Sequence, residues 1–496
     1  MSIKNTIKSI FLNPRSFFLE NLGIRQTIFK NTLWLAVAEG VTRFLKLILI
    51  IYVARILGAT EYGKFTFALA FVTLFAIFYD LGLSQITTRE LSQKQDKEKE
   101  EYPAVVSLKI LFGLITLVLI FGGSFFITTD PIIQKTIWIL AFYILFVNFS
   151  DIVYAFFRAR QRMEYESLSK IIQALVVTVV GFLVILNFPS IVNLSYSYLF
   201  SSLIALIFIL IFFHFKLFPL KISWQKSIWQ KFLAMSWPLA IAGMLGTVYS
   251  QIDSVMMGYL GQVTQTGWYN AAYKIIGVTL IPSGLIAQGL FPVLSRLFKE
   301  SAEKLQNIWN YFTEAMVFLA FPIVVGGIVL APRIIDWIYD PSFFPTGKEA
   351  ILAFQILIGT AGIIFLATPL IQILIVSNHQ NKLFWVTLSG AVVNVALNLI
   401  LIPKYSLYGA AIATVITYLL IFSILFKFVS KFTSVKIFDL KFLLSLFGVL
   451  LASGVMYFFI SQPLIYNLNI LLSILIGASI YSVAFIILKI LVKRFV

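Results

Sequence analysis

Three charged residues stand close together in a long apolar stretch near the start of the chain. Glu39, Arg43 and Lys46 follow the spacing i, i+4 and i+7, which places their side chains on one face of a helix. Glu39 can pair with Arg43, and Lys46 then has no partner in its own helix. The surplus of positive charge predicts that Arg43 and Lys46 bind an anionic group. The alternative is a structural ion pair beside a lysine that reaches toward water.

Five charged residues inside apolar stretches are candidates for coupling or gating. Asp253 predicts either an ion pair with Lys274 or a site for a proton or a sodium ion, and Glu39 is a further proton or cation site. Lys109 and Glu314 carry opposite charges at nearly equivalent positions of an internal repeat. We expect them to form a bridge that opens and closes, unless each side chain extends separately to the nearer membrane surface.

Two asparagines and three tyrosines offer contacts for a ligand rich in hydroxyl groups, such as a sugar. Asn394 and Asn398 are spaced i, i+4, so their amides share one face of a helix. The alternative is that they form hydrogen bonds between helices within lipid. Tyr249, Tyr269 and Tyr273 provide aromatic surfaces on which a sugar ring can stack.

No pattern typical of bond-breaking chemistry or metal binding accompanies these residues. The chain has no Cys, and its two histidines, His214 and His379, are isolated. No Ser-His-Asp set, pair of catalytic carboxylates or GxxxxGK[ST] phosphate loop is present. The sequence therefore predicts a protein that is not an enzyme, with no cofactor and no metal site.

The composition shows that helices in a membrane must position these residues. The chain has 496 residues, of which 60% are apolar or aromatic and 12% are charged, against about 25% charged in a typical soluble domain. A soluble domain with this composition would expose large apolar patches. This excludes a soluble enzyme, a nucleic-acid-binding module and a disordered chain.

Long apolar runs predict an all-α, polytopic membrane protein. A bilayer core about 30 Å thick needs roughly 20 apolar residues of helix. Fourteen stretches meet this requirement: 29–53, 65–85, 104–128, 132–155, 168–187, 191–214, 232–258, 268–292, 308–331, 349–377, 382–402, 406–427, 438–460 and 466–490.

The positions of the basic residues predict the orientation in the membrane. With both termini in the cytoplasm, 28 of the 38 Lys and Arg residues fall on the cytoplasmic side and six on the outer side. This asymmetry indicates the cytoplasmic membrane and explains the net charge of +17 without a nucleic-acid partner. Residues 1–28 combine basic and apolar clusters, which predicts an interfacial segment lying on the bilayer.

An internal repeat divides the fourteen predicted spans into two lobes. Leu57-Gly58 and Tyr62-Gly63-Lys64-Phe65 correspond to Leu260-Gly261 and Thr266-Gly267-Trp268-Tyr269, and the next inside loop, 89–94, corresponds to 295–300. The offsets are 203 to 207 residues, or six spans. Repeats an even number of spans apart share their orientation. We expect an N-lobe of spans 1–6 (29–214), a cytoplasmic linker (215–231) and a C-lobe of spans 7–12 (232–427). Spans 13 and 14 (438–490) form an appendage.

With these features the chain resembles the polysaccharide (Wzx/RfbX-type) flippases of the multidrug/oligosaccharidyl-lipid/polysaccharide exporter superfamily. The resemblance covers nearly the whole chain in order, through short motifs. These motifs are Leu57-Gly58 with Tyr62-Gly63, Asp80-Leu81-Gly82-Leu83 with Thr88-Arg89-Glu90, Phe157-Arg158-Ala159-Arg160-Gln161-Arg162, Asp253 to Gly261, and Asn394 with Asn398, Leu401 to Tyr405 and Gly409-Ala410-Ala411.

The resemblance implies a flippase that translocates a polyprenyl-diphosphate-linked oligosaccharide by alternating access of two lobes, for cell-surface polysaccharide biosynthesis. The implied partners are this lipid-linked glycan, membrane lipids and glycan-assembly proteins. Arg43 and Lys46 would then bind the diphosphate headgroup. The alternatives are a proton- or sodium-coupled multidrug exporter of the same superfamily and a peptidoglycan lipid-precursor flippase. A membrane glycan polymerase or ligase is disfavoured because no long outer loop is present.

Overall fold

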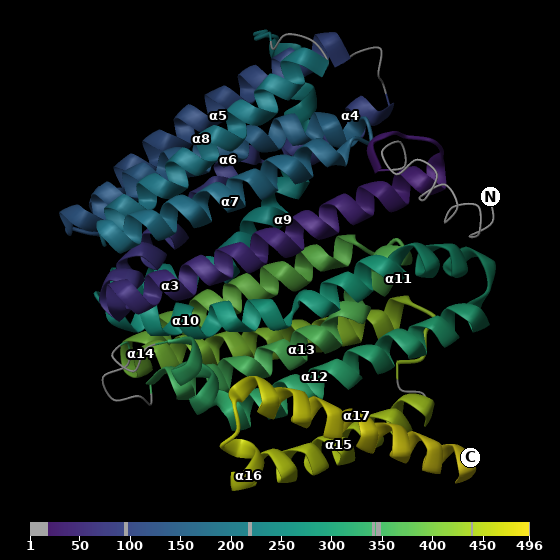
Figure 1. Cartoon of the computed structure of the whole chain (residues 1–496). Helices are drawn as coiled ribbons and strands as arrows, with labels where there is room; N and C mark the ends of the chain where they lie inside the picture. Colours follow the sequence, from purple (N-terminus) through teal and green to yellow (C-terminus); the bar gives the residue numbers. More distant parts are fainter. Residues whose placement is uncertain are drawn as a thin grey trace. The chain divides into compact units, whose positions relative to one another are not determined.

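The computed structural model describes residues 18–93, 98–216, 221–339, 343, 349–437 and 440–495 (Figure 1). Regular structure in these ranges is helical, and they contain no strand. The all-α class predicted from the sequence is therefore confirmed. Most of the predicted interfacial segment 1–28 lies outside the described residues.

Fifteen labelled helices follow one another along the described ranges. Their bounds are α3 (Ile24–Asp80), α4 (Leu83–Gln93), α5 (Glu98–Ile127), α6 (Pro131–Ala159), α7 (Met163–Asn187), α8 (Ile191–Lys216), α9 (Lys226–Tyr259), α10 (Val263–Thr279), α11 (Ile281–Glu300), α12 (Ala302–Ile338), α13 (Glu349–Val376), α14 (Asn381–Phe432), α15 (Leu440–Ile460), α16 (Pro463–Tyr466) and α17 (Ile470–Phe495).

The long helices accommodate the predicted membrane spans. Twelve helical stretches among the described residues are long and apolar enough to cross a membrane. The two longest, Gln26–Gln93 and Asn381–Phe432, each contain two predicted spans, separated by non-helical backbone at Gly58 and Ser406 respectively. The fourteen predicted spans therefore map onto these twelve stretches.

The chain divides into two compact units. The first comprises Met1–Leu57 and Lys64–Thr247, and the second comprises Gly58–Gly63 and Val248–Val496. The chain therefore passes from one unit to the other within α3 and again within α9. The repeat predicts lobes at 29–214 and 232–427, whose bounds differ from those of these units, and this division into functional lobes stays a prediction.

The main core of the first unit is built from apolar residues of α4, α5, α6, α8 and the start of α9. Helix α6 packs against α4, α5, α7 and α8. The ring of Tyr102 on α5 stacks on Phe213 of α8, with 5.3 Å between ring centroids, and meets Phe156 of α6 edge-on at 5.0 Å. Such aromatic contacts, fully removed from lipid and water, fix the helices of this unit against one another.

In the second unit α13 packs against α10, α11, α12 and α14. Helices α15 and α17, which correspond to the predicted appendage, pack against each other and against α12 (Figure 1). The hydroxyl of Tyr481 on α17 donates to the carbonyl of Phe318 on α12 at 2.8 Å. Arg333, near the other end of α12, donates to Ser473 at 3.1 Å and to the carbonyl of Leu468. These bonds attach the appendage to the second unit.

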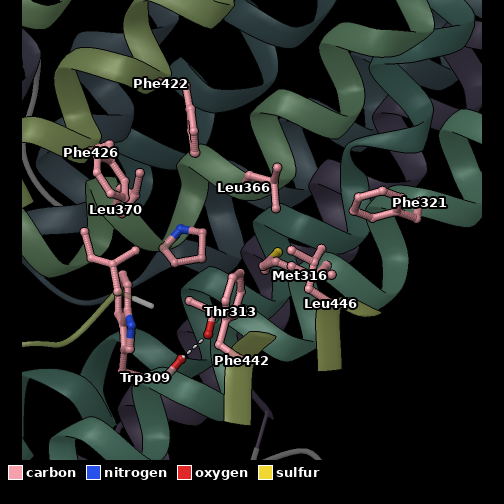
Figure 2. Close-up of a pocket in the computed structure, with 13 residues that line it drawn as sticks. Trp309, Thr313, Met316, Phe321, Leu366, Leu370, Phe422, Phe426, Phe442 and Leu446 are labelled. Atoms are coloured by element: carbon pink, nitrogen blue, oxygen red, sulfur yellow. Dashed lines mark hydrogen bonds between the residues drawn. The ribbon is translucent and has the colours of Figure 1, made fainter. Parts of the chain in front are cut away.

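A cavity of about 220 Å³ lies within the second unit. It is bordered by α12, α13, α14, α15 and the segment that joins α14 to α15 (Figure 2). Its lining includes Trp309, Leu370, Phe426 and Phe442, one from each of the four helices.

The two glycine turns of the repeat both have a positive φ angle. Gly58 has a φ of 76° and Gly261 has a φ of 74°, a region that glycine enters at little cost. This agreement is what related turns of a repeated unit should show.

The helical segments that follow these turns approach each other closely in the second unit. A Cβ atom at Gly63 would lie 1.9 Å from the carbonyl oxygen of Val263, and one at Gly267 would lie 2.2 Å from that of Ala59. No side chain fits at either glycine without moving the backbone of the facing segment. The contact is reciprocal, since each glycine faces a carbonyl of the other repeat.

Candidate functional site

The charged cluster on α3 contains the predicted ion pair. Nε of Arg43 donates to a carboxylate oxygen of Glu39 at 2.6 Å. The side chain of Arg43 is 49% exposed and that of Glu39 is 55% exposed, so neither is buried against a neighbouring helix. Lys46 is partly exposed, and no hydrogen bond or ion pair joins it to another described residue. The helix therefore carries one cation paired to an acid and one that is free to meet an anion.

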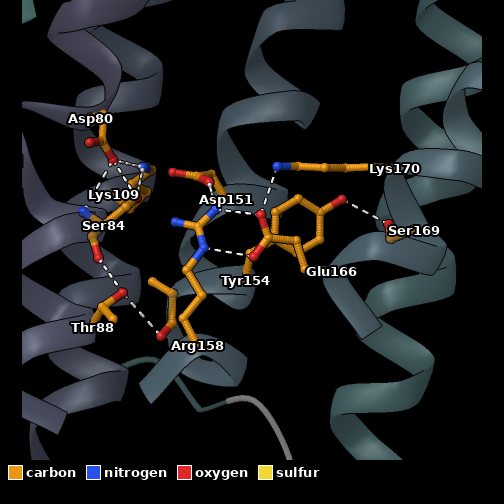
Figure 3. Close-up of polar contacts among 11 residues, drawn as sticks. Asp80, Ser84, Thr88, Lys109, Asp151, Tyr154, Arg158, Glu166, Ser169 and Lys170 are labelled. Atoms are coloured by element: carbon orange, nitrogen blue, oxygen red, sulfur yellow. Dashed lines mark hydrogen bonds and ion pairs between the residues drawn. The ribbon is translucent and has the colours of Figure 1, made fainter. Parts of the chain in front are cut away.

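Lys109 belongs to a buried polar network of the first unit (Figure 3). Its side chain is fully buried on α5, and its Nζ forms an ion pair with Asp80 at the end of α3. The same Nζ lies 3.1 Å from the hydroxyl of Ser84 on α4, which itself donates to Asp80. These bonds offset the cost of burying the Lys109 charge and join three helices.

A second part of this network joins α6 to α7 (Figure 3). The guanidinium of Arg158 donates to both carboxylate oxygens of Glu166, each at 2.6 Å, and to Asp151 at 3.1 Å. Lys170 also donates to Glu166, at 2.7 Å. Each charge has an opposite partner, so this cluster serves to order the end of the helix bundle and has little capacity left for a ligand.

Glu314 also has a local partner. Its carboxylate on α12 forms an ion pair with Lys489 on α17. Lys109 and Glu314 thus each form an ion pair within their own unit. The bridge between lobes that we predict for them would require both local ion pairs to break, and this is costly for the buried Lys109 pair.

Asp253 is the centre of a buried polar cluster in the second unit. The hydroxyls of Tyr269 on α10 and Thr414 on α14 donate to its Oδ2 at 2.6 and 2.8 Å. The amide of Asn398, also on α14, donates to its Oδ1. Three hydrogen bonds from two other helices therefore converge on one carboxylate of α9.

The ion pair predicted between Asp253 and Lys274 is absent from this structure. In the described ranges, no Lys or Arg side chain lies within ion-pair distance of Asp253. Tyr269 occupies the face of α10 that meets Asp253. Lys274 follows five residues later, and this spacing turns it to another face of the helix.

The candidate glycan contacts fall into two groups. Tyr269, Asn394 and Asn398 are buried in the Asp253 cluster, and Asn398 also donates to Asn394 at 3.2 Å. Asn394 and Asn398 therefore form hydrogen bonds within and between helices, which is the alternative to glycan contact.

Tyr249 and Tyr273 are partly exposed and stay predicted glycan contacts. The ring of Tyr273 stacks on that of Tyr269, with 5.8 Å between centroids and an interplanar angle of 10°. The hydroxyl of Tyr249 lies 3.3 Å from that of Tyr418. Tyr273 therefore adjoins the Asp253 cluster, whereas Tyr249 contacts Tyr418 of α14.

The Asp253 cluster has the donor set of a monovalent cation or proton site. The carboxylate of Asp253, the amide oxygens of Asn394 and Asn398 and the hydroxyl of Thr414 are hard oxygen ligands. The Oδ1 atom of Asn398 is buried and accepts no hydrogen bond from the residues that the structure describes. Among these residues, no group of three or more His, Cys, Asp or Glu side chains suits a metal ion. A transition-metal site is therefore not indicated in the described ranges.

Sequence reasoning missed Thr414 and Lys489 as partners of the candidate residues. Thr414 lies one helical turn after Ala410, in the run Gly409-Ala410-Ala411. Small residues of this kind allow close approach between membrane helices, and this could have signalled that the neighbouring hydroxyl meets another helix. Lys489 carries no local signal, because its pairing with Glu314 depends on how α17 packs on α12.

Comparison with known proteins gives one family match. A family model described as polysaccharide biosynthesis protein matches residues 28–298. The chain is 24% identical over 389 residues to a protein named probable flippase AglR of Haloferax volcanii, covering 75% of this chain and 77% of that protein. It is 22% identical over 399 residues to the capsular polysaccharide biosynthesis protein CapF of Staphylococcus aureus, covering 78% and 96%.

A solved structure shares the fold. The lipid II flippase MurJ in an inward closed conformation superposes with a TM-score of 0.75, covering 93% of this chain and 99% of the other, at 17% sequence identity. At this identity the likeness concerns the arrangement of the helices alone.

Proposed function

The chain belongs to the polysaccharide biosynthesis protein family, and from this premise we propose that it flips a polyprenyl-diphosphate-linked oligosaccharide across the cytoplasmic membrane. Relatives named as a flippase and as a capsular polysaccharide biosynthesis protein support this class of cargo. The glycan then serves cell-surface polysaccharide assembly, in which glycan-assembly proteins receive it. Both termini lie in the cytoplasm, and the transport step breaks no covalent bond.

The observation that carries this proposal is the surplus of cations on α3. Arg43 is half exposed and paired with Glu39, whereas Lys46 has no partner among the described residues. A diphosphate brings two or more negative charges, which suit a guanidinium and an ammonium side by side. In this mechanism Arg43 and Lys46 neutralise the headgroup while the prenyl chain stays in lipid.

The membrane potential can supply part of the driving force. A potential of 100 mV, negative inside, favours outward movement of each negative charge by about 2.3 kcal/mol. If the cations on α3 stay in place while the headgroup moves, each charge of the diphosphate gains this amount. Rocking of lobe 29–214 against lobe 232–427 then exposes the cargo on alternate sides.

The Asp253 cluster is the site that we assign to coupling. Burial of its carboxylate without a Lys or Arg partner in the described ranges is costly, unless a proton or a cation compensates the charge. Loss of that proton or cation would alter the bonds that link α9, α10 and α14. Glu39 and Lys274 are secondary candidates for this role.

The proposal is tested by reconstitution. Purified protein is placed in liposomes with a fluorescent polyprenyl-diphosphate oligosaccharide in both leaflets, and a membrane-impermeant reagent then quenches the outer leaflet. The proposed activity makes nearly all of the label accessible over time, whereas protein-free liposomes keep about half protected. Protection equal to that of protein-free liposomes would contradict the function.

A peptidoglycan lipid precursor is the second candidate cargo. It has the same type of diphosphate headgroup, and the fold is shared with a lipid II flippase. Competition in the same liposomes distinguishes the two cargoes. The proposed function predicts that an oligosaccharide carrier is flipped faster than a carrier bearing a muropeptide.

A further inference from the structure

The cavity of the second unit has walls of hydrocarbon side chains (Figure 2). Thr313 and the indole nitrogen of Trp309 are the polar side-chain groups among its thirteen lining residues. A cavity of about 150 Å³ with walls of this kind stays dry and takes apolar ligands. The cavity here, at about 220 Å³, is larger, so its chemistry suits a hydrocarbon chain and not water.

The indole N–H of Trp309 indicates that a ligand of this cavity carries one atom that accepts a hydrogen bond. Trp309 is fully buried, and its Nε1 has no hydrogen-bond partner among the described residues. Figure 2 shows the nitrogen edge of the indole turned toward Thr313 and Phe442, which also line the cavity. The hydroxyl of Thr313 donates to the carbonyl of Trp309 at 3.0 Å. A buried donor without an acceptor costs about 1–3 kcal/mol, and an oxygen on the ligand would remove that cost.

Basic residues adjoin the lining of the cavity. Lys436 precedes Ile437 and Lys427 follows Phe426, and both lysines are exposed. The side chain of Gln306 holds the backbone of Lys436 through two hydrogen bonds, of 3.0 and 2.8 Å. Cations between helices at the cytoplasmic surface attract anionic lipid headgroups.

We propose that this cavity binds an acyl chain of an anionic phospholipid from the cytoplasmic leaflet. An ester carbonyl of the lipid accepts the hydrogen bond of Trp309, and the phosphate lies near Lys436. Trp309 lies seven residues after the start of α12, or about 10 Å along the helix, the depth expected of an ester below a headgroup. The cytoplasmic level follows from the orientation predicted by the basic residues.

The chemistry distinguishes this ligand from the tail of the cargo. A prenyl tail is hydrocarbon throughout and would leave the N–H of Trp309 unpaired, whereas a glycerol ester supplies an acceptor. The site therefore goes beyond the proposed transport function, and it is separate from Arg43 and Lys46. A lipid seated there would join α12 and α14 to α15.

The test measures lipid that stays bound to the purified chain. The wild-type protein is equilibrated with phosphatidylglycerol in detergent, and the bound lipid is counted by native mass spectrometry. Trp309→Phe keeps the ring and removes the N–H, so its affinity should fall about fivefold, the size expected for one hydrogen bond. Trp385→Phe, at a side chain that is 56% exposed in the same unit, is the matched control and should bind as the wild type does.

Two further measurements decide the assignment. Leu370→Trp fills the cavity without changing Trp309 and should abolish retention while the thermal unfolding midpoint stays near that of the wild type. Phosphatidylglycerol with brominated acyl chains should quench the wild-type fluorescence more than that of Trp309→Phe. Unchanged retention of phosphatidylglycerol in both Trp309→Phe and Leu370→Trp would contradict lipid binding in this cavity. Equal retention of phosphatidylcholine, or displacement of phosphatidylglycerol by a polyprenyl phosphate, would overturn the anionic phospholipid as its ligand.

Discussion

The side-chain hydroxyls of Thr60 and Thr264 lie 2.8 Å apart and share a hydrogen bond across 204 residues of sequence. The two threonines occupy equivalent positions of the internal repeat. Beside them Gly63 and Gly267 each meet a backbone carbonyl of the other segment. All four residues belong to the second compact unit, yet Thr60 and Gly63 precede the second predicted span of the N-lobe.

This contact predicts the behaviour of a cysteine pair. The chain has no Cys, so Thr60→Cys with Thr264→Cys introduces the only two thiols, at side chains already in contact. We expect alternating access of the predicted lobes to separate these residues when the outer side opens. Oxidation should therefore form a disulfide that stops flipping in liposomes, and reduction should restore it.

Each single cysteine variant is the control and should be insensitive to oxidant. A double variant that is fully cross-linked yet flips at the wild-type rate would show that Gly58–Gly63 moves with the second unit throughout the cycle. That result would contradict opening at this contact.

The buried pair of Lys109 and Asp80 predicts a large effect on stability. Lys109→Met leaves Asp80, whose side chain is 22% exposed, as an uncompensated charge, and the cost is at most that of a fully buried pair, about 3–5 kcal/mol. The free energy of unfolding in mixed micelles should fall by up to that amount. Adding Asp80→Asn to the same chain should restore much of it, because no buried charge remains.

Arg296→Gln is the control for this measurement. Arg296 and Glu300 form an exposed pair with 3.8 Å between nitrogen and oxygen, and such pairs contribute about 0–1 kcal/mol. If Lys109→Met cost no more than Arg296→Gln, the network in Figure 3 would not stabilise the first unit.

The Asp253 cluster predicts a loss of ion dependence. Asp253→Asn removes the charge, while Tyr269 and Thr414 can still donate to the remaining amide oxygen. The variant should fold, and its flipping rate should no longer respond to a sodium gradient or a pH gradient, whichever drives the wild type. Asp336→Asn, at an exposed position of α12, should keep the wild-type response. An unchanged response in Asp253→Asn would remove Asp253 from the coupling step.

The membrane fold could be predicted because its signals are local. Runs of about 20 apolar residues identify the spans, and the recurring Leu57-Gly58 and Leu260-Gly261 mark related turns of the repeat. The two predicted spans 29–53 and 65–85 lie on either side of the break in α3. This break, at Gly58, is a single residue wide and leaves helical backbone on both sides.

The candidate site was predictable only in part, for a physical reason. The pairing of Glu39 with Arg43 lies within one helix, where spacing alone determines contact. The partners of Asp253 come from α10 and α14, and a sequence does not say which faces of distant helices meet. The sequence therefore leaves open whether Asp253 pairs with Lys274 or forms a proton or sodium site, and whether Asn394 and Asn398 bond other helices or a glycan; it does not show that Asp253 and these two asparagines form one cluster.

The most direct test of the central claim is the flipping rate of a variant without the two cations of α3. Arg43→Gln with Lys46→Gln removes two charge-assisted contacts to the diphosphate, each worth about 1.5–3 kcal/mol. The rate of oligosaccharide-lipid flipping in liposomes should therefore fall roughly 100-fold or more. Lys221→Gln with Lys226→Gln, which removes the same charge from exposed positions of the linker, should flip at the wild-type rate. Wild-type flipping by the Arg43 and Lys46 double variant, folded and inserted at normal levels, would contradict headgroup binding by α3.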